Sequence, residues 1–146
     1  MVDSSVWIDY FNGSECAEVI YLDTILGIQP VVIGDNILTE VLQGFKGDKE
    51  YKKAKQLLTA LPLFQLSNKV LAVKSADNYR ALRKKGITVR KTIDTIIATY
   101  CIEQNIQLLF TDRDFLPFVE LLGLKSIKSC AYLCLFSWFL TLPIKG

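Results

Sequence analysis

The sequence predicts a single-domain α/β fold in which a parallel sheet is flanked by helices. Short apolar stretches typical of buried strands alternate with longer stretches whose apolar residues recur at helical spacing. This alternation along the chain is the order expected for a parallel sheet with helical connections. The length of 146 residues fits one domain with one sizeable hydrophobic core.

The N-terminal stretch leaves almost no room for a strand. Only Met1 and Val2 precede Asp3, and Ser4 or Ser5 can cap the helix that follows. The apolar residues after these serines recur at helical spacing as far as residue 11. We therefore expect a short first strand, an acidic residue at its end, and a helix directly after it.

The elements from residue 16 to residue 66 follow from apolar periodicity and from capping and turn residues. In order, they are a helix over 16–28, a strand over 30–33, a helix from Asp35 or Asn36 to Phe45, a lysine-rich helix over 51–61 and a strand over 64–66.

The second half of the chain repeats the alternation of helices and strands. Gly86 can end a helix at its C-terminus, and Thr92 or Asp114 can cap one at its N-terminus. The predicted elements are a helix over 68–85, a helix that begins at Thr92, a strand over 106–110, a helix from Asp114 to Leu122 and a strand over 123–127.

The C-terminal tail, residues 129–146, differs from the predicted domain over residues 1–128. Its stretch 130–144 is almost wholly apolar and carries no charge. It is shorter than the roughly 20 residues that a membrane-spanning helix needs, so we expect no membrane association. A packing segment, an interface and an out-of-frame extension all remain open as its role.

Composition narrows the chemistry. The chain has 17 basic and 15 acidic residues, so its overall charge indicates no partner. Its four cysteines lack the spacing of a zinc site and suit free thiols in a cytoplasmic protein. It contains no histidine, which excludes Ser-His-Asp catalysis and nearly every catalytic zinc site. An enzyme of this composition must use carboxylates, lysines, hydroxyls or metal ions, and for a hydrolase carboxylates that hold Mg²⁺ or Mn²⁺ are the natural choice.

Four acidic residues are placed where a parallel sheet can bring them together. Asp3 and Asp112 follow predicted strands, whereas Glu40 and Asp94 lie in helices next to strands. Ligands of open α/β sheets bind at the carboxyl ends of the strands. Carboxylates gathered there would raise one another's pKa values unless a divalent cation neutralised them.

Structural roles can also explain three of the acids singly. Asp94 falls in the first turn of its helix, where a negative charge is favourable. Glu40 can be a solvated residue on a helix flank, and Asp114 suits a helix N-cap. None of these explanations covers Asp112, at the end of a strand.

A second group of residues is basic. Arg83, Lys84, Lys85, Arg90 and Lys91 are separated by no acidic residue. They can form a solvated helix end, or they can bind the phosphates of a nucleic acid. The sequence leaves both interpretations open.

Four stretches together resemble the successive motifs of PIN-domain ribonucleases, most closely VapC-type toxins of toxin–antitoxin pairs. They are 3–9 (DSSVWID), 39–45 (TEVLQGF), 90–98 (RKTIDTIIA) and 108–115 (LLFTDRDF). The resemblance covers about residues 1–128. The chain departs from the family pattern in its short first strand and in its tail.

The resemblance implies a site, a reaction and partners. By position it assigns metal binding and catalysis to Asp3, Glu40, Asp94 and Asp112, with Asp114 as an accessory acid and Ser5 or Ser4 beside the first aspartate. It implies Mg²⁺- or Mn²⁺-dependent cleavage of RNA phosphodiester bonds, a cognate antitoxin and a homodimer. The basic group is the candidate RNA-binding surface.

The short first strand keeps an alternative open, a catalytically weak PIN-like module that binds RNA or protein. A magnesium-dependent phosphatase is disfavoured because no paired-aspartate motif follows the first strand.

Overall fold

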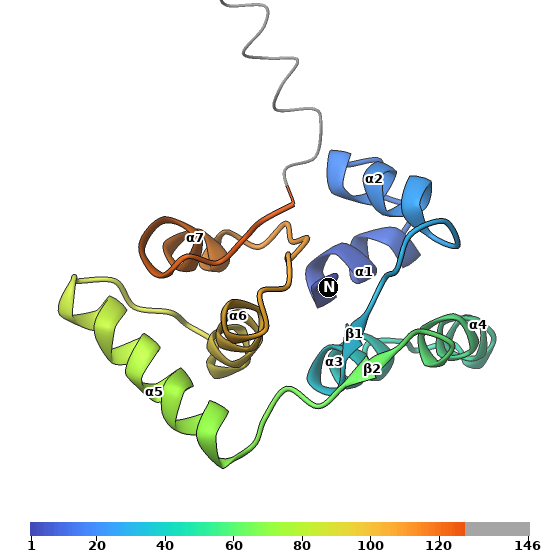
Figure 1. The fold of residues 1–146 in the computed structure, drawn as a ribbon. Helices are drawn as coiled ribbons and strands as arrows, with labels where there is room; N and C mark the ends of the chain where they lie inside the picture. The colour runs from blue at the N-terminus through green and yellow to red at the C-terminus, as the bar shows by residue number, and fades with distance from the viewer. Residues whose placement is uncertain (128–146) are drawn as a thin grey trace, which may run out of the picture.

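The computed structural model describes residues 1–127, so the predicted tail, 129–146, lies outside the described residues. Helices dominate this part of the chain (Figure 1). In chain order the elements are α1 (Ser4–Phe11), α2 (Ala17–Ile25), β1 (Ile33–Gly34), α3 (Asp35–Gln43), α4 (Asp48–Thr59), β2 (Leu63–Phe64), α5 (Lys69–Lys84), α6 (Thr92–Glu103), the 3-10 helix η1 (Arg113–Phe115) and α7 (Leu116–Leu122).

Strand pairing is parallel, as the alternation predicts, but the strands are short. β1 and β2 pair with Ile33 opposite Leu63. The predicted strands at the N-terminus, at 106–110 and at 123–127 are reduced to parallel bridges, Val2 to Leu109 and Leu108 to Ser126. The predicted α/β class with a parallel sheet is therefore confirmed, with fewer residues in strands than expected.

The short N-terminal segment is nevertheless firmly tied to its neighbour. The Met1 ammonium donates to the Gln107 carbonyl over 2.8 Å, and the Leu109 amide donates to the Met1 carbonyl over 2.9 Å. The Asp3 amide in turn donates to the Leu109 carbonyl over 2.9 Å. These hydrogen bonds fix Asp3 at the point where the chain leaves the sheet.

Several helix caps differ from the predicted ones. Asp3, not Ser4 or Ser5, caps α1, and its carboxylate accepts a hydrogen bond from the Ser5 amide. Asp112, not Asp114, caps η1 in the same way. Thr92 is the first residue of α6 and makes no capping hydrogen bond. The predicted caps of α1 and η1 were wrong because Asp3 and Asp112 each end a sheet segment. Their backbone is still extended, as a capping residue requires.

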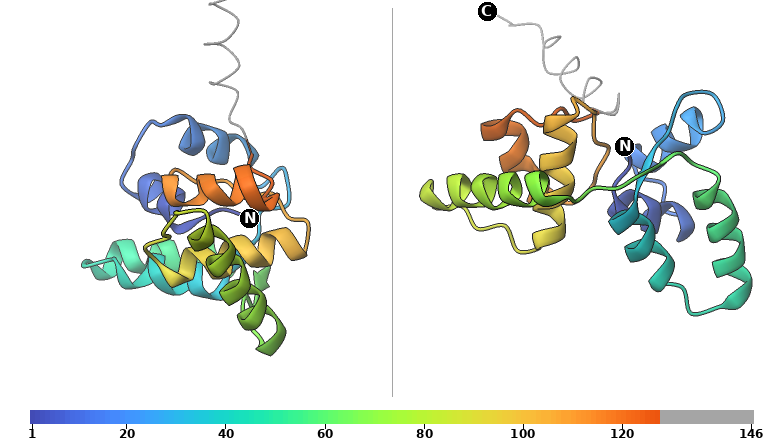
Figure 2. Two further views of the ribbon diagram at one scale, coloured as in Figure 1. Left: turned by 90° about the vertical axis from the view of Figure 1, so that its left-hand side faces the viewer. Right: turned by 60° about the horizontal axis from the view of Figure 1, so that its bottom comes forward.

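The core lies between two groups of helices. In Figure 1 the helices α5, α6 and α7 lie on one side of the extended segments, and α1 to α4 lie on the other; the right-hand view of Figure 2 shows the same division. The largest fully buried side chains come from both groups: Trp7, Phe115, Phe118, Leu22, Ile33, Ile37, Leu58, Leu66, Leu82, Ile97, Leu108 and Leu109. Within the described residues, no helix is long and apolar enough to cross a membrane.

Candidate metal centre

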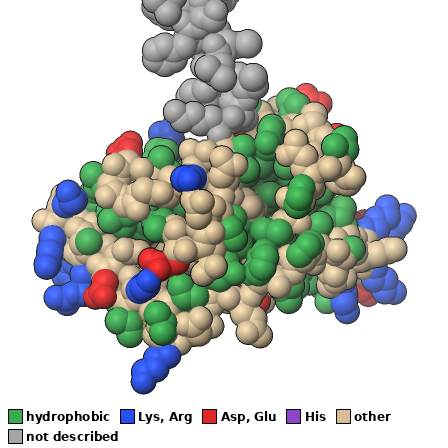
Figure 3. Space-filling model, in the orientation of Figure 1, with side chains coloured by type: hydrophobic (Ala, Val, Ile, Leu, Met, Phe, Trp, Pro, Cys, Tyr) green, Lys and Arg blue, Asp and Glu red, His purple; other side chains and the backbone are tan. Residues whose placement is uncertain are grey.

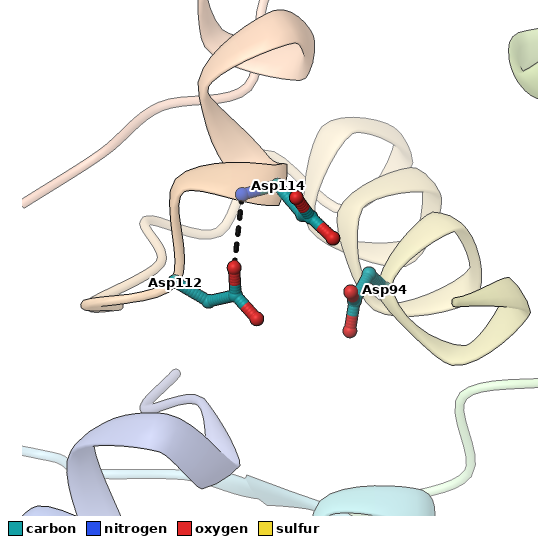
Figure 4. A group of neighbouring side chains, drawn as sticks. All are labelled: Asp94, Asp112 and Asp114. Atoms are coloured by element: carbon teal, nitrogen blue, oxygen red, sulfur yellow. Dashed lines mark hydrogen bonds between the residues drawn. The ribbon is translucent and has the colours of Figure 1, made fainter. Parts of the chain in front are cut away.

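Asp94, Asp112 and Asp114 form the acidic cluster. Each aspartate offers one carboxylate oxygen, and these oxygens lie within 4.8 Å of one another. Asp94 projects from the first turn of α6, and the other two flank the start of η1 (Figure 4). The side chains of the three aspartates extend into one shared space. The structure thus brings together Asp94 of α6 and Asp112 at the start of the next element, η1.

Local hydrogen bonds orient the η1 acids. One Asp112 oxygen accepts from the Asp114 amide over 3.0 Å, the interaction drawn in Figure 4. Arg90 donates two hydrogen bonds to Asp114, from its Nε and Nη2 atoms, each 3.1 Å from a different carboxylate oxygen. Such a two-point contact sets the plane of the carboxylate as well as its position.

Asp3 is the N-cap residue of α1 and is only 2% exposed. Its Oδ2 accepts hydrogen bonds from the Ser5 amide, at 2.9 Å, and from the Ser5 hydroxyl, at 2.6 Å. The Ser5 Oγ also accepts from the Thr111 amide over 3.2 Å. Ser5 thus joins the first aspartate to the segment that carries Asp112.

Glu40 joins the site through the other serine. The Ser4 hydroxyl donates to Glu40 Oε2 over 2.8 Å and ties α3 to the start of α1. Glu40 is close enough to raise the pKa values of Asp3 and Asp94. The structure therefore brings all four predicted acids to one region, although the tight cluster contains Asp114 and not Asp3 or Glu40.

Burial and like charge make this region unfavourable for carboxylates alone. Burial raises the pKa of Asp94 from 3.8 to about 7; Lys91 opposes the rise, and Asp3, Asp112 and Glu40 add to it. Burial is also the main cause that raises the pKa of Asp3, against the hydrogen bonds from Ser5. Among the described residues, Asp3 Oδ1 and Asp94 Oδ2 are buried with no hydrogen-bond partner. Such oxygens need a proton or a cation.

The donor set suits a hard divalent cation. All candidate ligands are carboxylate oxygens, which Mg²⁺ and Mn²⁺ prefer over nitrogen and sulfur. Asp94, which carries one of the two unpartnered oxygens, also belongs to the group of three aspartates whose oxygens lie within 4.8 Å of one another. The residues present therefore fit a divalent cation.

The predicted basic residues separate into two groups. Lys91 places its Nζ atom 3.5 Å from Asp112, and Arg90 pairs with Asp114. Burial lowers the pKa of Lys91, but the nearby carboxylates, Asp94 first, outweigh it and raise the pKa overall. Arg83, Lys84 and Lys85 are exposed at the end of α5. In Figure 3 the lysine and arginine side chains at the left edge lie over this helix.

The chain matches a known family over most of its length. The match is to the PIN domain and covers residues 1–118. The chain belongs to the PIN-domain family. The resemblance stated from the four sequence motifs is therefore confirmed.

Relatives of this PIN-domain chain include named ribonucleases. It is 26% identical over 117 residues to Ribonuclease VapC11 of Mycobacterium tuberculosis and to VapC ribonuclease Mb1587 of Mycobacterium bovis, covering 79% of this chain and 87% of each relative. A crystal structure of VapBC2 from Rickettsia felis bound to a promoter DNA fragment has a similar fold, with a TM-score of 0.65 at 17% identity. That match covers 87% of this chain and 96% of the other.

Sequence reasoning missed several contacts of the PIN domain. It offered Arg90 as a candidate for RNA binding but did not foresee that this residue pairs with Asp114. It left open which serine accompanies Asp3, and the structure uses both, Ser5 for Asp3 and Ser4 for Glu40. The adjacent serines were the available signal, because consecutive residues of a helix's first turn point in different directions.

Proposed function

We propose that this PIN-domain protein is an endoribonuclease that hydrolyses RNA phosphodiester bonds with Mg²⁺ or Mn²⁺, as the toxin of a toxin–antitoxin pair. The observation that carries the proposal is the acidic cluster of Asp94, Asp112 and Asp114, in which Asp94 has a raised pKa and a buried oxygen without a hydrogen-bond partner. The names of the VapC relatives support RNA as the substrate. A nuclease also suits a chain without histidine, because carboxylate chemistry remains available to it.

The acids have different roles in this proposal. Asp94 and Asp112 are the central ligands, Asp3 completes the set from α1, and Asp114 is accessory because Arg90 already holds both its oxygens. When bound, the divalent cation supplies charge neutralisation and activation of a water molecule. Glu40 would add a fourth carboxylate to the set from α3, where the Ser4 hydroxyl orients it.

The serines and the basic residues have supporting roles. Ser5 hydrogen-bonds to both the Asp3 carboxylate and the Thr111 amide and so fixes their relative positions. Ser4 orients Glu40. Lys91 lies beside Asp112 and can approach a scissile phosphate, because its side chain is 54% exposed. Arg83, Lys84, Lys85 and Arg90 are the remaining candidates for RNA phosphates.

The partners of this protein are also part of the proposal. The VapBC2 complex of Rickettsia felis supports a cognate antitoxin. An arginine from such an antitoxin would pair with the acidic cluster and compete with the cation. The proposal includes a homodimer and a cytoplasmic location, and the free thiols of Cys16 and Cys101 are consistent with a reducing compartment.

The alternative, a weak module that only binds RNA or protein, depends on a loosely held Asp3. The hydrogen bonds of Met1 and Asp3 to the segment 107–109 argue against it. Asp3 is also held at its carboxylate by Ser5. The short first strand therefore does not leave the first acid free to move.

The test is cleavage of a labelled structured RNA with added Mn²⁺, beside an EDTA control and an Asp94→Asn protein. The matched control is Asp77→Asn, the same substitution at an exposed carboxylate on α5. We expect wild type and Asp77→Asn to cut, and EDTA or Asp94→Asn to abolish cutting. Intact RNA in every reaction, with RNA binding retained, would support the binding module instead.

A further inference from the structure

A groove of about 370 Å³ lies at the edge of the sheet where its extended segments begin. Two of the residues that line it, Val31 and Val32, lead into β1, and Gln107 begins the segment that leads to Asp112. Asp112 itself follows the end of that segment and belongs to the acidic cluster. The groove and the acidic cluster therefore lie at opposite edges of the sheet, and the proposed nuclease chemistry does not use the groove.

Apolar side chains from several elements form most of this groove. Tyr21 and Ile25 come from α2, Val32 from the segment before β1, and Phe64 from β2. None of the described residues that line the groove has a charged side chain. Its occupant must therefore be apolar and uncharged, because a buried charge without a partner is costly.

The apolar surface continues beyond the groove. Ile28, directly before the groove residue Gln29, is 80% exposed, and Leu63, directly before Phe64, is 53% exposed. In Figure 3 hydrophobic side chains gather over α2 and over the segment that joins it to β1. Contiguous apolar surface of this kind marks a place that another segment or molecule covers.

The sequence supplies an apolar segment next to this groove. Ile127, the last residue that the structure describes, is one of the lining residues. The stretch 130–144 has no charged residue and is almost wholly apolar. Only Lys128 and Ser129 separate it from Ile127, and two extended residues span at most about 7 Å. The apolar stretch therefore begins beside the groove.

We propose that the stretch 130–144 packs into this groove of the same chain, with its apolar side chains against Val32, Phe64 and Ile127. The stretch and the lining match in chemistry, because neither brings a charged side chain to be buried. The short connection also keeps the stretch at an effective concentration on the order of millimolar, an advantage that a separate molecule lacks. The inference does not depend on the proposed function, because the groove lies away from the acidic cluster.

The experiment begins with disulfide trapping in the full chain. Cys16→Ser together with Cys130→Ser leaves two native thiols, Cys134 in the apolar stretch and Cys101, which is only 1% exposed. A new cysteine at an exposed position of the groove can then form a disulfide with Cys134 if the stretch lies there, since the two Cβ atoms must come within about 4.5 Å.

Gln29→Cys and Gln107→Cys place that thiol on two different segments of the groove. Gln104→Cys is the matched control, because this exposed glutamine lies only three residues from Gln107 and does not line the groove. We expect at least one groove cysteine to bond to Cys134 at least about 10-fold faster than the control under mild oxidation, by peptide mapping of the monomer band. Equal rates at all three positions would overturn the inference.

The other occupant to test is the apolar stretch of a second copy of this chain. In that case the same disulfide would join two chains, and the trapped product would run as a dimer on a non-reducing gel. The yield would also rise with protein concentration, whereas a bond within one chain forms at a rate that is independent of concentration. A concentration-dependent dimer as the main product would overturn the inference.

Tryptophan fluorescence gives a second measurement. The chain has two tryptophans, Trp7, which is 0% exposed, and Trp138, which lies in the apolar stretch. Val32→Asp places a charge in the groove and should release the stretch, so the emission should move to longer wavelength and acrylamide quenching should increase several-fold. Val70→Asp, the same substitution at a 63% exposed position of α5, is the matched control and should behave as wild type.

Far-UV circular dichroism shows whether Val32→Asp is folded. Wild-type emission and quenching that already match those of the folded Val32→Asp protein would overturn the inference, because Trp138 would then be equally exposed in both. If Val32→Asp does not fold, disulfide trapping still decides, since Gln29 and Gln107 are exposed and their substitution leaves the core intact.

Discussion

Asp94→Asn should stabilise the metal-free protein at alkaline pH while it removes activity. Burial raises the pKa of Asp94 from 3.8 to about 7, a shift of roughly 3 units at about 1.36 kcal/mol per unit. The upper limit of the penalty for charging this group in the folded state is therefore about 4 kcal/mol. The neighbouring Lys91 and Asp112 side chains are 54% and 23% exposed, so solvent screens the cluster. We expect a gain of about 1–2 kcal/mol after this screening.

The sign of the pH dependence follows from proton uptake. Between pH 3.8, where an unfolded aspartate titrates, and about 7, the folded protein holds the Asp94 proton more tightly than the unfolded chain. The free energy of unfolding contributed by this group therefore falls as pH rises through that window and is constant above it. Asparagine carries no charge, so its advantage should be full at pH 8 and absent at pH 4.

Urea denaturation in EDTA at the two pH values measures this difference. Asp77→Asn, at an exposed position of α5, is the control and should change little at either pH. A variant that is less stable than wild type at pH 8, or that shows an equal difference at both pH values, would refute the reasoning about burial.

Three further predictions concern other contacts of the structure. Ser4→Ala removes the hydroxyl that donates to Glu40 over 2.8 Å, so urea denaturation should give about 1 kcal/mol less stability; an unchanged midpoint would show that this hydrogen bond contributes nothing. Gly34→Ala should lower stability by about 1–3 kcal/mol, because the new methyl group would overlap the fully buried Leu66; a rise in the melting temperature would contradict it. Arg90→Ala should leave the melting temperature unchanged, since Arg90 is exposed. The RNA association constant, measured by fluorescence anisotropy, should depend less steeply on salt, with the slope of its logarithm against log salt concentration reduced by roughly 1. An unchanged slope would show that Arg90 does not contact RNA.

The helices were predictable because their signals are local. Apolar periodicity identifies α5 and α6, and Asn68 and Gly86 mark the ends of α5 as expected. The position of Asp112 at the end of a sheet segment also follows from a local pattern. These features depend on residues a few positions apart, which the sequence displays directly.

The contacts around Asp3 depend on residues far apart in the chain. The caps at Ser4 or Ser5 were wrong because the Asp3 amide pairs with Leu109, which keeps Asp3 extended and leaves its carboxylate to cap α1. The contact of Ser4 with Glu40 joins α1 to α3. Neither contact leaves a periodic signal, so sequence reasoning could place the acids near one edge but could not assign their partners.

The central claim is that these carboxylates hold a divalent cation for RNA cleavage. Its most direct test is Mn²⁺ binding by electron paramagnetic resonance, with RNA cleavage measured on the same preparations of wild type, Asp94→Asn and Asp77→Asn. We predict that wild type and Asp77→Asn bind Mn²⁺ and cut RNA over the same range of Mn²⁺ concentration, and that Asp94→Asn does neither. Equal Mn²⁺ affinity in wild type and Asp94→Asn, or cleavage that persists in EDTA, would contradict it.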